Sequence, residues 1–179
     1  MSVHADALEV LSRWHPPNDG QRRLRVSYLE HLARHPDGVF RECHPDHITA
    51  STLVVSSDRQ QILLHLHRKY DIWVQFGGHC DVTDSGLASA ALREAVEESG
   101  ISDLRLIGRS PVQLSTHEVL CGPVRPSHHL DVRYVAVADA GAPTVTSNES
   151  AEVRWFALDD LPTGMERELL ELIDLARWL

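Results

Sequence analysis

The sequence of 179 residues predicts a mixed α/β (α+β) domain built of layered strands and helices. Two observations support this fold class. Helical patterns open and close the chain, at residues 1–38 and about 163–178, and strand-like segments surround one central helix between them. This order differs from regular βαβ repeats. The length suits a single globular unit, and we expect a helical extension, residues 1–45, packed on a core domain, residues 46–179.

The spacing of apolar residues predicts the N-terminal helices and the strands. Leu24, Tyr28 and Leu32 recur at four-residue intervals, which places them on one side of a helix. Further along the chain, short runs of aliphatic, β-branched and aromatic residues are divided by polar turns. These runs predict strands at residues 47–56, 61–66, 72–76, 104–114, 129–138 and 153–157. A β-rich core therefore follows the helical extension.

The clearest predicted helix covers residues 85–99. Its sequence has high helical propensity, and Asp84 or Ser85 is available as the N-cap. Gly100 stands where helices commonly end.

This helix carries a cluster of carboxylates. Glu94, Glu97 and Glu98 are spaced i, i+3 and i+4, so their side chains leave one side of the helix and can reach a common ion. Hard divalent cations such as Mg²⁺ prefer clustered oxygen ligands. Arg93 lies four residues before Glu97 and can pair with it. The alternative for such a run is a solvated, salt-bridged helix surface without a function.

The segment from Gly78 to Ile101 resembles the signature of the Nudix hydrolase family, G-x5-E-x7-R-E-U-x-E-E-x-G-U, where U is a bulky aliphatic residue. The matching positions are Arg93, Glu94, Glu97, Glu98, Gly100 and Ile101. Asp84 stands at the early glutamate position, eight residues instead of seven precede Arg93, and Ala95 replaces the bulky aliphatic residue. The resemblance covers about residues 47–160. It implies a Nudix-type sheet between helices.

The resemblance implies a metal-dependent hydrolase that cleaves a small-molecule substrate of the form X-diphosphate-Y by attack of water on phosphorus, with Mg²⁺ or Mn²⁺ as the cofactor. The implied metal-binding residues are Gly78, Glu94, Glu97 and Glu98. The implied catalytic residues are Arg93, Glu94, Glu149 and Glu152. Glu94 is either a ligand or the general base. Family members often carry a further base on a loop before a late strand, and Glu149 and Glu152 are the candidates for it here.

Four residues are candidates for substrate binding. His79 follows the glycine pair of the signature and can touch the ion or a phosphate, or it can simply cap a turn. His129, Asp131 and Arg133 alternate along a predicted strand and so share one face of it. That face either contacts substrate or faces solvent.

Composition excludes several other classes of protein. A formal charge of −9 argues against a stable nucleic-acid or anionic-membrane surface, which requires a basic patch. The chain has no run of about 18 apolar residues that would span a membrane. Three widely spaced cysteines, Cys43, Cys80 and Cys121, indicate neither a disulfide framework nor a zinc cluster with paired cysteines. We expect a cytoplasmic protein, for which a homodimer is plausible.

Two other functions are compatible with a Nudix resemblance. A nucleotide-sensing module would bind its ligand without cleaving it, but such a module has no chemical need for three glutamates. An isoprenyl diphosphate isomerase would use a cysteine, and Cys80 lies close to the glutamate helix. The sequence around Cys80 does not resemble the cysteine motif of those isomerases, so this alternative ranks last.

Overall fold

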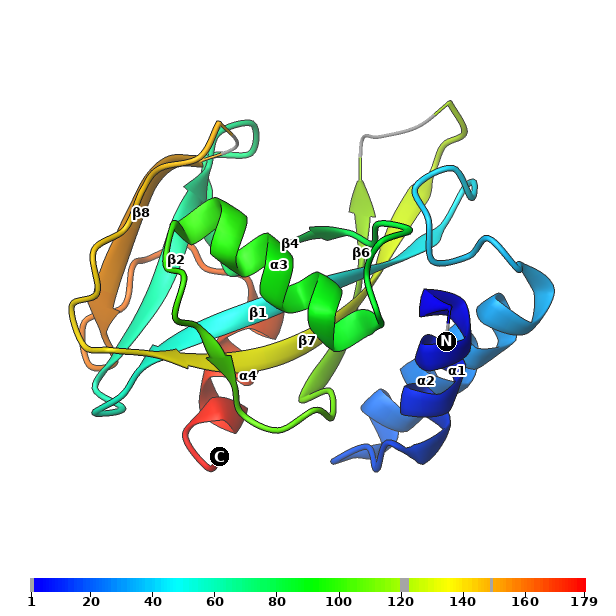
Figure 1. The fold of residues 1–179 in the computed structure, drawn as a ribbon, viewed down its shortest axis with the longest axis horizontal. Helices are drawn as coiled ribbons and strands as arrows, with labels where there is room; N and C mark the ends of the chain where they lie inside the picture. The colour runs from blue at the N-terminus through cyan, green and yellow to red at the C-terminus, as the bar shows by residue number, and fades with distance from the viewer. Residues whose placement is uncertain (1, 120–122, 149) are drawn as a thin grey trace.

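A curled, mixed β-sheet forms the centre of the computed structural model, which describes residues 2–119, 123–148 and 150–179 (Figure 1). The main path of the sheet runs β3-β2-β1-β7-β5, and β4, β6 and β8 pair with β1, β7 and β2. β1 and β7 are parallel over ten residue pairs, whereas the other pairings are antiparallel. The strands are β1 (His47–Ser56), β2 (Gln61–His67), β3 (Ile72–Val74), β4 (Phe76–His79), β5 (Arg105–Leu106), β6 (Gln113–Val119), β7 (Ser127–Ala138) and β8 (Ser150–Ala157).

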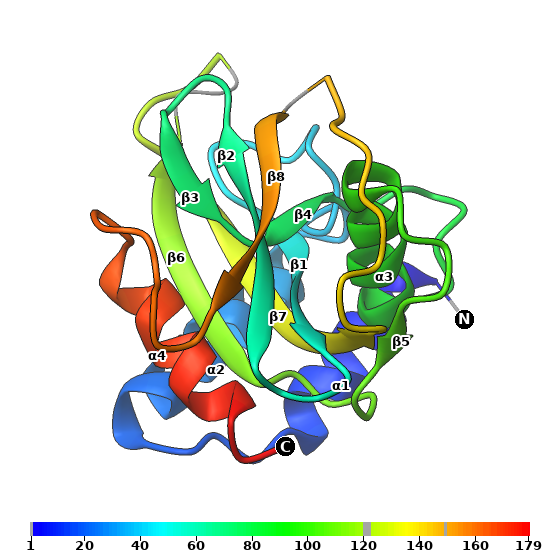
Figure 2. The same cartoon turned by 90° about the vertical axis from the view of Figure 1, so that its left-hand side faces the viewer.

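Helices cover both faces of this sheet. α3 (Leu87–Ser99) and α4 (Arg167–Ala176) lie on opposite sides of it in both views (Figures 1 and 2). Alternate residues of β1 separate the two packing layers: Ala50 packs in a cluster with residues of α3, and Leu53 packs in a cluster with residues of α4. The predicted α/β (α+β) class, with a mixed sheet sandwiched between helices, is confirmed.

The two N-terminal helices are α1 (Val3–Arg13) and α2 (Asp19–Arg34). Ser2 and Asn18 cap them by accepting hydrogen bonds from backbone N–H groups. Their apolar residues belong to the same buried cluster as residues of β1, β7 and α3, and the hydroxyl of Tyr28 donates to the carbonyl of Ser115 on β6 at 2.8 Å. Among the described residues, no helix is both long and apolar enough to cross a membrane.

The structure corrects two predicted strands and the start of the last predicted helix. The predicted strand 104–114 is divided into β5 and β6, since the chain leaves the edge of β7 at a turn where Gly108 has φ +75°. The predicted strand 72–76 is divided because β3 pairs with β2 whereas β4 pairs with β1. The last helix begins at Arg167, not near residue 163, because Gly164 adopts φ +79° in the preceding turn.

The start of α3 also differs from the prediction. Neither Asp84 nor Ser85 is its N-cap: the helix begins after Gly86, and the N–H of Leu87 donates to the Asp6 carboxylate of α1 at 2.8 Å. Asp84 is unavailable because it pairs with Arg93. An acidic side chain from the N-terminal helices therefore satisfies the first turn of the glutamate helix.

Candidate active site

The glutamate helix packs against the end of strand β4, where two glycines permit close approach. A Cβ atom on Gly78 would lie 2.8 Å from Cδ and Oε2 of Glu94, closer than normal van der Waals contact. Glycine at this position therefore lets the Glu94 carboxylate lie against the strand backbone. The N–H of Gly77 donates to Oε2 of Glu98 at 3.0 Å, and Glu98 is 5% exposed. The strand backbone thus holds the buried glutamate in a fixed position.

Arg93 joins the helix to the loop and the strand. Its Nε and Nη2 atoms donate to both carboxylate oxygens of Asp84, each at 3.0 Å. Its Nη1 atom donates to Glu94 at 2.9 Å and to Glu97 at 3.3 Å. Nη2 also donates to the backbone carbonyl of His79 at 2.9 Å. The hydrogen bonds with Asp84, and the neighbouring Glu94, raise the pKa of Arg93, so the guanidinium remains charged.

This network explains the departure at Asp84. Asp84, at the position of the early glutamate, forms a bidentate ion pair with Arg93, and its side chain is only 5% exposed. Glu97 is the most accessible member, with 58% of its side chain exposed against 16% for Glu94. The three glutamates offer oxygen ligands of the kind that hard divalent cations prefer.

Asp131 and Arg133 lie on the sheet face opposite α3. Nε of Arg133 and Oδ2 of Asp131 form an ion pair at 2.9 Å. Both residues are buried: Asp131 is 2% exposed and Arg133 is 3% exposed. Ser51 and Thr49 donate to Asp131 at 2.7 and 3.2 Å, and Arg133 donates to Gln113 at 3.0 Å. Burial alone would raise the pKa of Asp131, but the nearby Arg133 and His117 and the hydrogen bonds from Arg133 and Ser51 hold it below its usual value. The alternative of a solvent face is therefore wrong.

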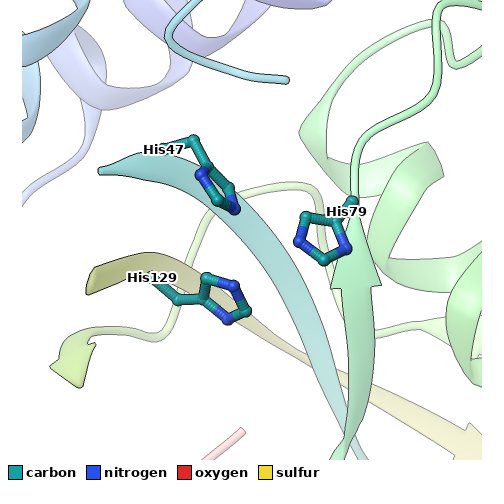
Figure 3. Close-up of side chains that lie close together, drawn as sticks. All are labelled: His47, His79 and His129. Carbon is teal, nitrogen blue, oxygen red and sulfur yellow. The ribbon is translucent and has the colours of Figure 1, made fainter. Parts of the chain in front are cut away.

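His79 and His129 converge on a third histidine, His47, which the sequence interpretation missed (Figure 3). The parallel register pairs His47 with His129, and the antiparallel register pairs Thr49 with His79. Burial lowers the pKa of His79 to about 4 and that of His129 to about 3, and it also lowers the pKa of His47. No sequence pattern gives the strand register, so the sequence offered no signal for this grouping.

Of the two proposed bases near the late strand, only Glu152 lies among the described residues, where no described contact joins it to this network. Glu152 lies on β8 and pairs with Arg154 at 3.0 Å, with both side chains about half exposed. β8 pairs with β2, whereas the strand beneath the glutamate helix pairs with β1. Glu149 lies outside the described residues.

The fold and the glutamate site together define the class of protein. A family model described as NUDIX domain matches residues 45–176, and the chain belongs to this family. As a member of this family it is a Nudix-type diphosphohydrolase, a hydrolase of nucleoside diphosphate-linked compounds in general. The family predicted from the glutamate helix is confirmed. A search of curated protein sequences gives no significant match.

Solved structures share the same architecture. A NUDIX-family hydrolase from Clostridium perfringens has 25% identity and a TM-score of 0.55, over 73% of this chain and 97% of its own. An Ap4A hydrolase from C. elegans has 18% identity and a TM-score of 0.59, over 72% and 93%. The NUDIX domain of NrtR from Shewanella oneidensis, in complex with ADP ribose, has 19% identity and a TM-score of 0.57, over 83% and 96%. The latter two support the fold alone.

Proposed function

We propose that this protein hydrolyses the diphosphate bond of a nucleoside diphosphate derivative with the help of Mg²⁺ or Mn²⁺. Family members generally use divalent metal ions. The observation that carries the proposal is the set of three glutamates on α3: Glu98 is bound by the N–H of Gly77, Glu94 lies against Gly78, and Arg93 bridges Glu94 and Glu97. The residues proposed to hold the ion are Glu94, Glu97, Glu98 and the backbone carbonyl of Gly78.

The carboxylates and their supports have different tasks in this proposal. A bound divalent ion neutralises phosphate charge and makes water a better nucleophile. Glu97 and Glu98 hold the ion, and the N–H of Gly77 fixes the orientation of Glu98. Arg93 is a positioning residue, because its contacts are with protein carboxylates and a backbone carbonyl. Asp84 restrains Arg93 through two hydrogen bonds.

The general base is one of three glutamates: Glu94, Glu149 or Glu152. A pH–rate profile of the three glutamine variants separates them, because removal of the base abolishes the acid limb of the profile, whereas removal of a ligand raises the metal requirement. Glu94 has the strongest structural support, since its carboxylate lies directly over Gly78.

The proposed substrate contacts lie on the sheet face opposite α3. His79 follows Gly78 on β4, so its side chain lies on the face opposite Glu94, one residue from the glutamate site. His129, Asp131 and Arg133 continue this polar face along β7. Asp131 and Arg133 are buried and hydrogen-bonded to each other, so they would hold rigid the strand that presents the more exposed His129 to polar groups on a substrate.

The isomerase alternative has little support from the site. Cys80 is 6% exposed, and burial raises the pKa of its thiol to about 12, so the reactive thiolate is scarce at neutral pH. The sensing alternative is separated from hydrolysis by product formation: a sensor binds ligand with metal and releases no phosphorylated product.

The test is a Glu97→Gln variant assayed with Mg²⁺ or Mn²⁺ against a panel of nucleoside diphosphate sugars, dinucleoside polyphosphates, NADH, ADP-ribose and nucleoside triphosphates. Because Glu97 is exposed, the substitution should leave the fold intact. We expect turnover to fall by about 100-fold or more, since a ligand of the ion is lost. Glu171→Gln, on the exposed side of α4, is the matched control and should retain activity. Unchanged turnover in Glu97→Gln would overturn the metal assignment.

A further inference from the structure

Three histidine rings from three different strands face one another on the sheet face opposite α3 (Figure 3). His47 comes from β1, His79 from β4 and His129 from β7. The ring centroids are 5.1 Å apart for His47 and His79, 4.9 Å for His47 and His129, and 5.1 Å for His79 and His129. One ring nitrogen of each histidine lies within 4.8 Å of the others. The three rings therefore surround a common point.

His47 is oriented as metal-binding histidines usually are. Its Nδ1 atom lies 3.1 Å from the backbone carbonyl of Cys43, which can only accept a hydrogen bond. The proton therefore resides on Nδ1, and Nε2 carries the lone pair. His47 is 2% exposed, and its Nε2 atom is buried and has no hydrogen-bond partner in the described part of the chain. A buried polar atom without a partner is destabilising, so this lone pair calls for a ligand.

We propose that His47, His79 and His129 form a binding site for a borderline divalent cation, with Zn²⁺ as the best match. Three imidazole nitrogens without a carboxylate suit zinc better than Mg²⁺ or Mn²⁺. Three protein ligands also leave a further coordination position for water or a substrate oxygen. Neutral imidazole is the form that binds a metal, and the hydrogen bond from Nδ1 of His47 to the Cys43 carbonyl leaves the Nε2 lone pair available for an ion.

This site is distinct from the glutamate site although strand β4 contributes to both. Gly78 faces Glu94 of α3, and the next residue, His79, points to the other face because side chains alternate along a strand. On β1, Ala50 packs toward α3, whereas His47 and Thr49 face the opposite side with Asp131. The two sites therefore select different ions: oxygen ligands on one face and nitrogen ligands on the other.

An ion can reach the site from solvent. His47 is buried, but His79 and His129 are only partly buried. Zn–N distances in proteins are about 2.0–2.1 Å, so the nitrogens must move closer than their present separation when the ion binds. Rotation of the two partly exposed rings supplies this movement without a change in the strands.

The test is zinc binding by the chelator-treated protein, measured by equilibrium dialysis and metal analysis in the presence of millimolar Mg²⁺, which occupies the glutamate site. We expect one zinc ion per chain in the wild type. His47→Asn, His79→Asn and His129→Asn should each weaken zinc binding by about 10-fold or more. His128→Asn is the matched control, because His128 neighbours His129 on the strand but contacts Asp46 instead. Less than one zinc ion in the wild type, or equal binding by the three variants and the control, would overturn the proposal.

A second measurement needs only the wild type and so does not depend on whether the variants fold. Long-range ¹H–¹⁵N NMR of the histidine rings should show ring-nitrogen shifts for these three residues when zinc is added. Shifts confined to other histidines would refute the site. The result is independent of the hydrolase proposal: Glu97→Gln should lose turnover but retain zinc, whereas His47→Asn should lose zinc whether or not hydrolysis is observed.

Discussion

Replacement of Gly78 by alanine should separate activity from stability. The added Cβ would lie 2.8 Å from Cδ and 3.0 Å from Oε1 of Glu94. Carbon atoms in contact are normally about 3.5–4.0 Å apart, so the carboxylate must move by roughly 1 Å. The obstacle is the end of a flexible side chain, which can give way without disturbing the fold. We therefore expect turnover to fall by about 100-fold, the usual effect of a 1 Å misplacement, with little change in melting temperature.

The neighbouring glycine provides the matched control. A Cβ on Gly77 would collide with Cβ of Ser51 and lie 2.6 Å from its Cα and 2.8 Å from the carbonyl oxygen of Ala50. These atoms belong to the central strand β1 and cannot move aside. Gly77→Ala should therefore destabilise the fold by about 1–3 kcal/mol or more, which corresponds to a melting temperature lower by roughly 2–4 °C per kcal/mol.

Both variants are measured by thermal unfolding and by metal-dependent hydrolysis of the substrate that the panel identifies. The titration of Mn²⁺ into each variant gives a second measure of the glutamate site. Wild-type turnover and Mn²⁺ affinity in Gly78→Ala would refute the conclusion that this glycine makes room for Glu94. A large loss of stability in Gly78→Ala would show that the strand, and not the carboxylate, is displaced.

Three further predictions concern residues around the site. Arg93→Lys should lower metal affinity by about 10-fold or more while the fold survives, because lysine cannot donate to Asp84 and the glutamates together; metal titration checks this. Asp6→Ala should cost about 1 kcal/mol of unfolding free energy, since the first turn of α3 loses its acceptor, and an unchanged denaturation midpoint would contradict the cap. Burial lowers the pKa of His65 to about 4, whereas the unfolded value is about 6.5. As the pH falls, the unfolded chain takes up the proton at a higher pH than the folded chain does. The melting temperature should therefore fall between pH values of about 6.5 and 4, and it should fall less steeply in His65→Gln, which lacks this titrating group.

The local pattern of the sequence determines the helices, most strands and the carboxylate cluster. Glu94, Glu97 and Glu98 share one side of α3 because helical spacing depends only on positions within the helix. The end of this helix at Gly100, with φ +74°, follows from the same local chemistry. The family also follows from this segment, since its signature lies within one strand end, one loop and one helix.

Contacts between distant segments are decided by the tertiary structure alone. Asp84 pairs with Arg93, and the first turn of α3 is instead bound by Asp6, which accepts from Leu87, 81 positions away in the chain. His47 meets His129 only because β1 and β7 pair in parallel in one particular register. A shift of that register by one residue would turn these side chains to opposite faces. Helical periodicity is local and can be read from the sequence, whereas strand register depends on packing of the whole sheet.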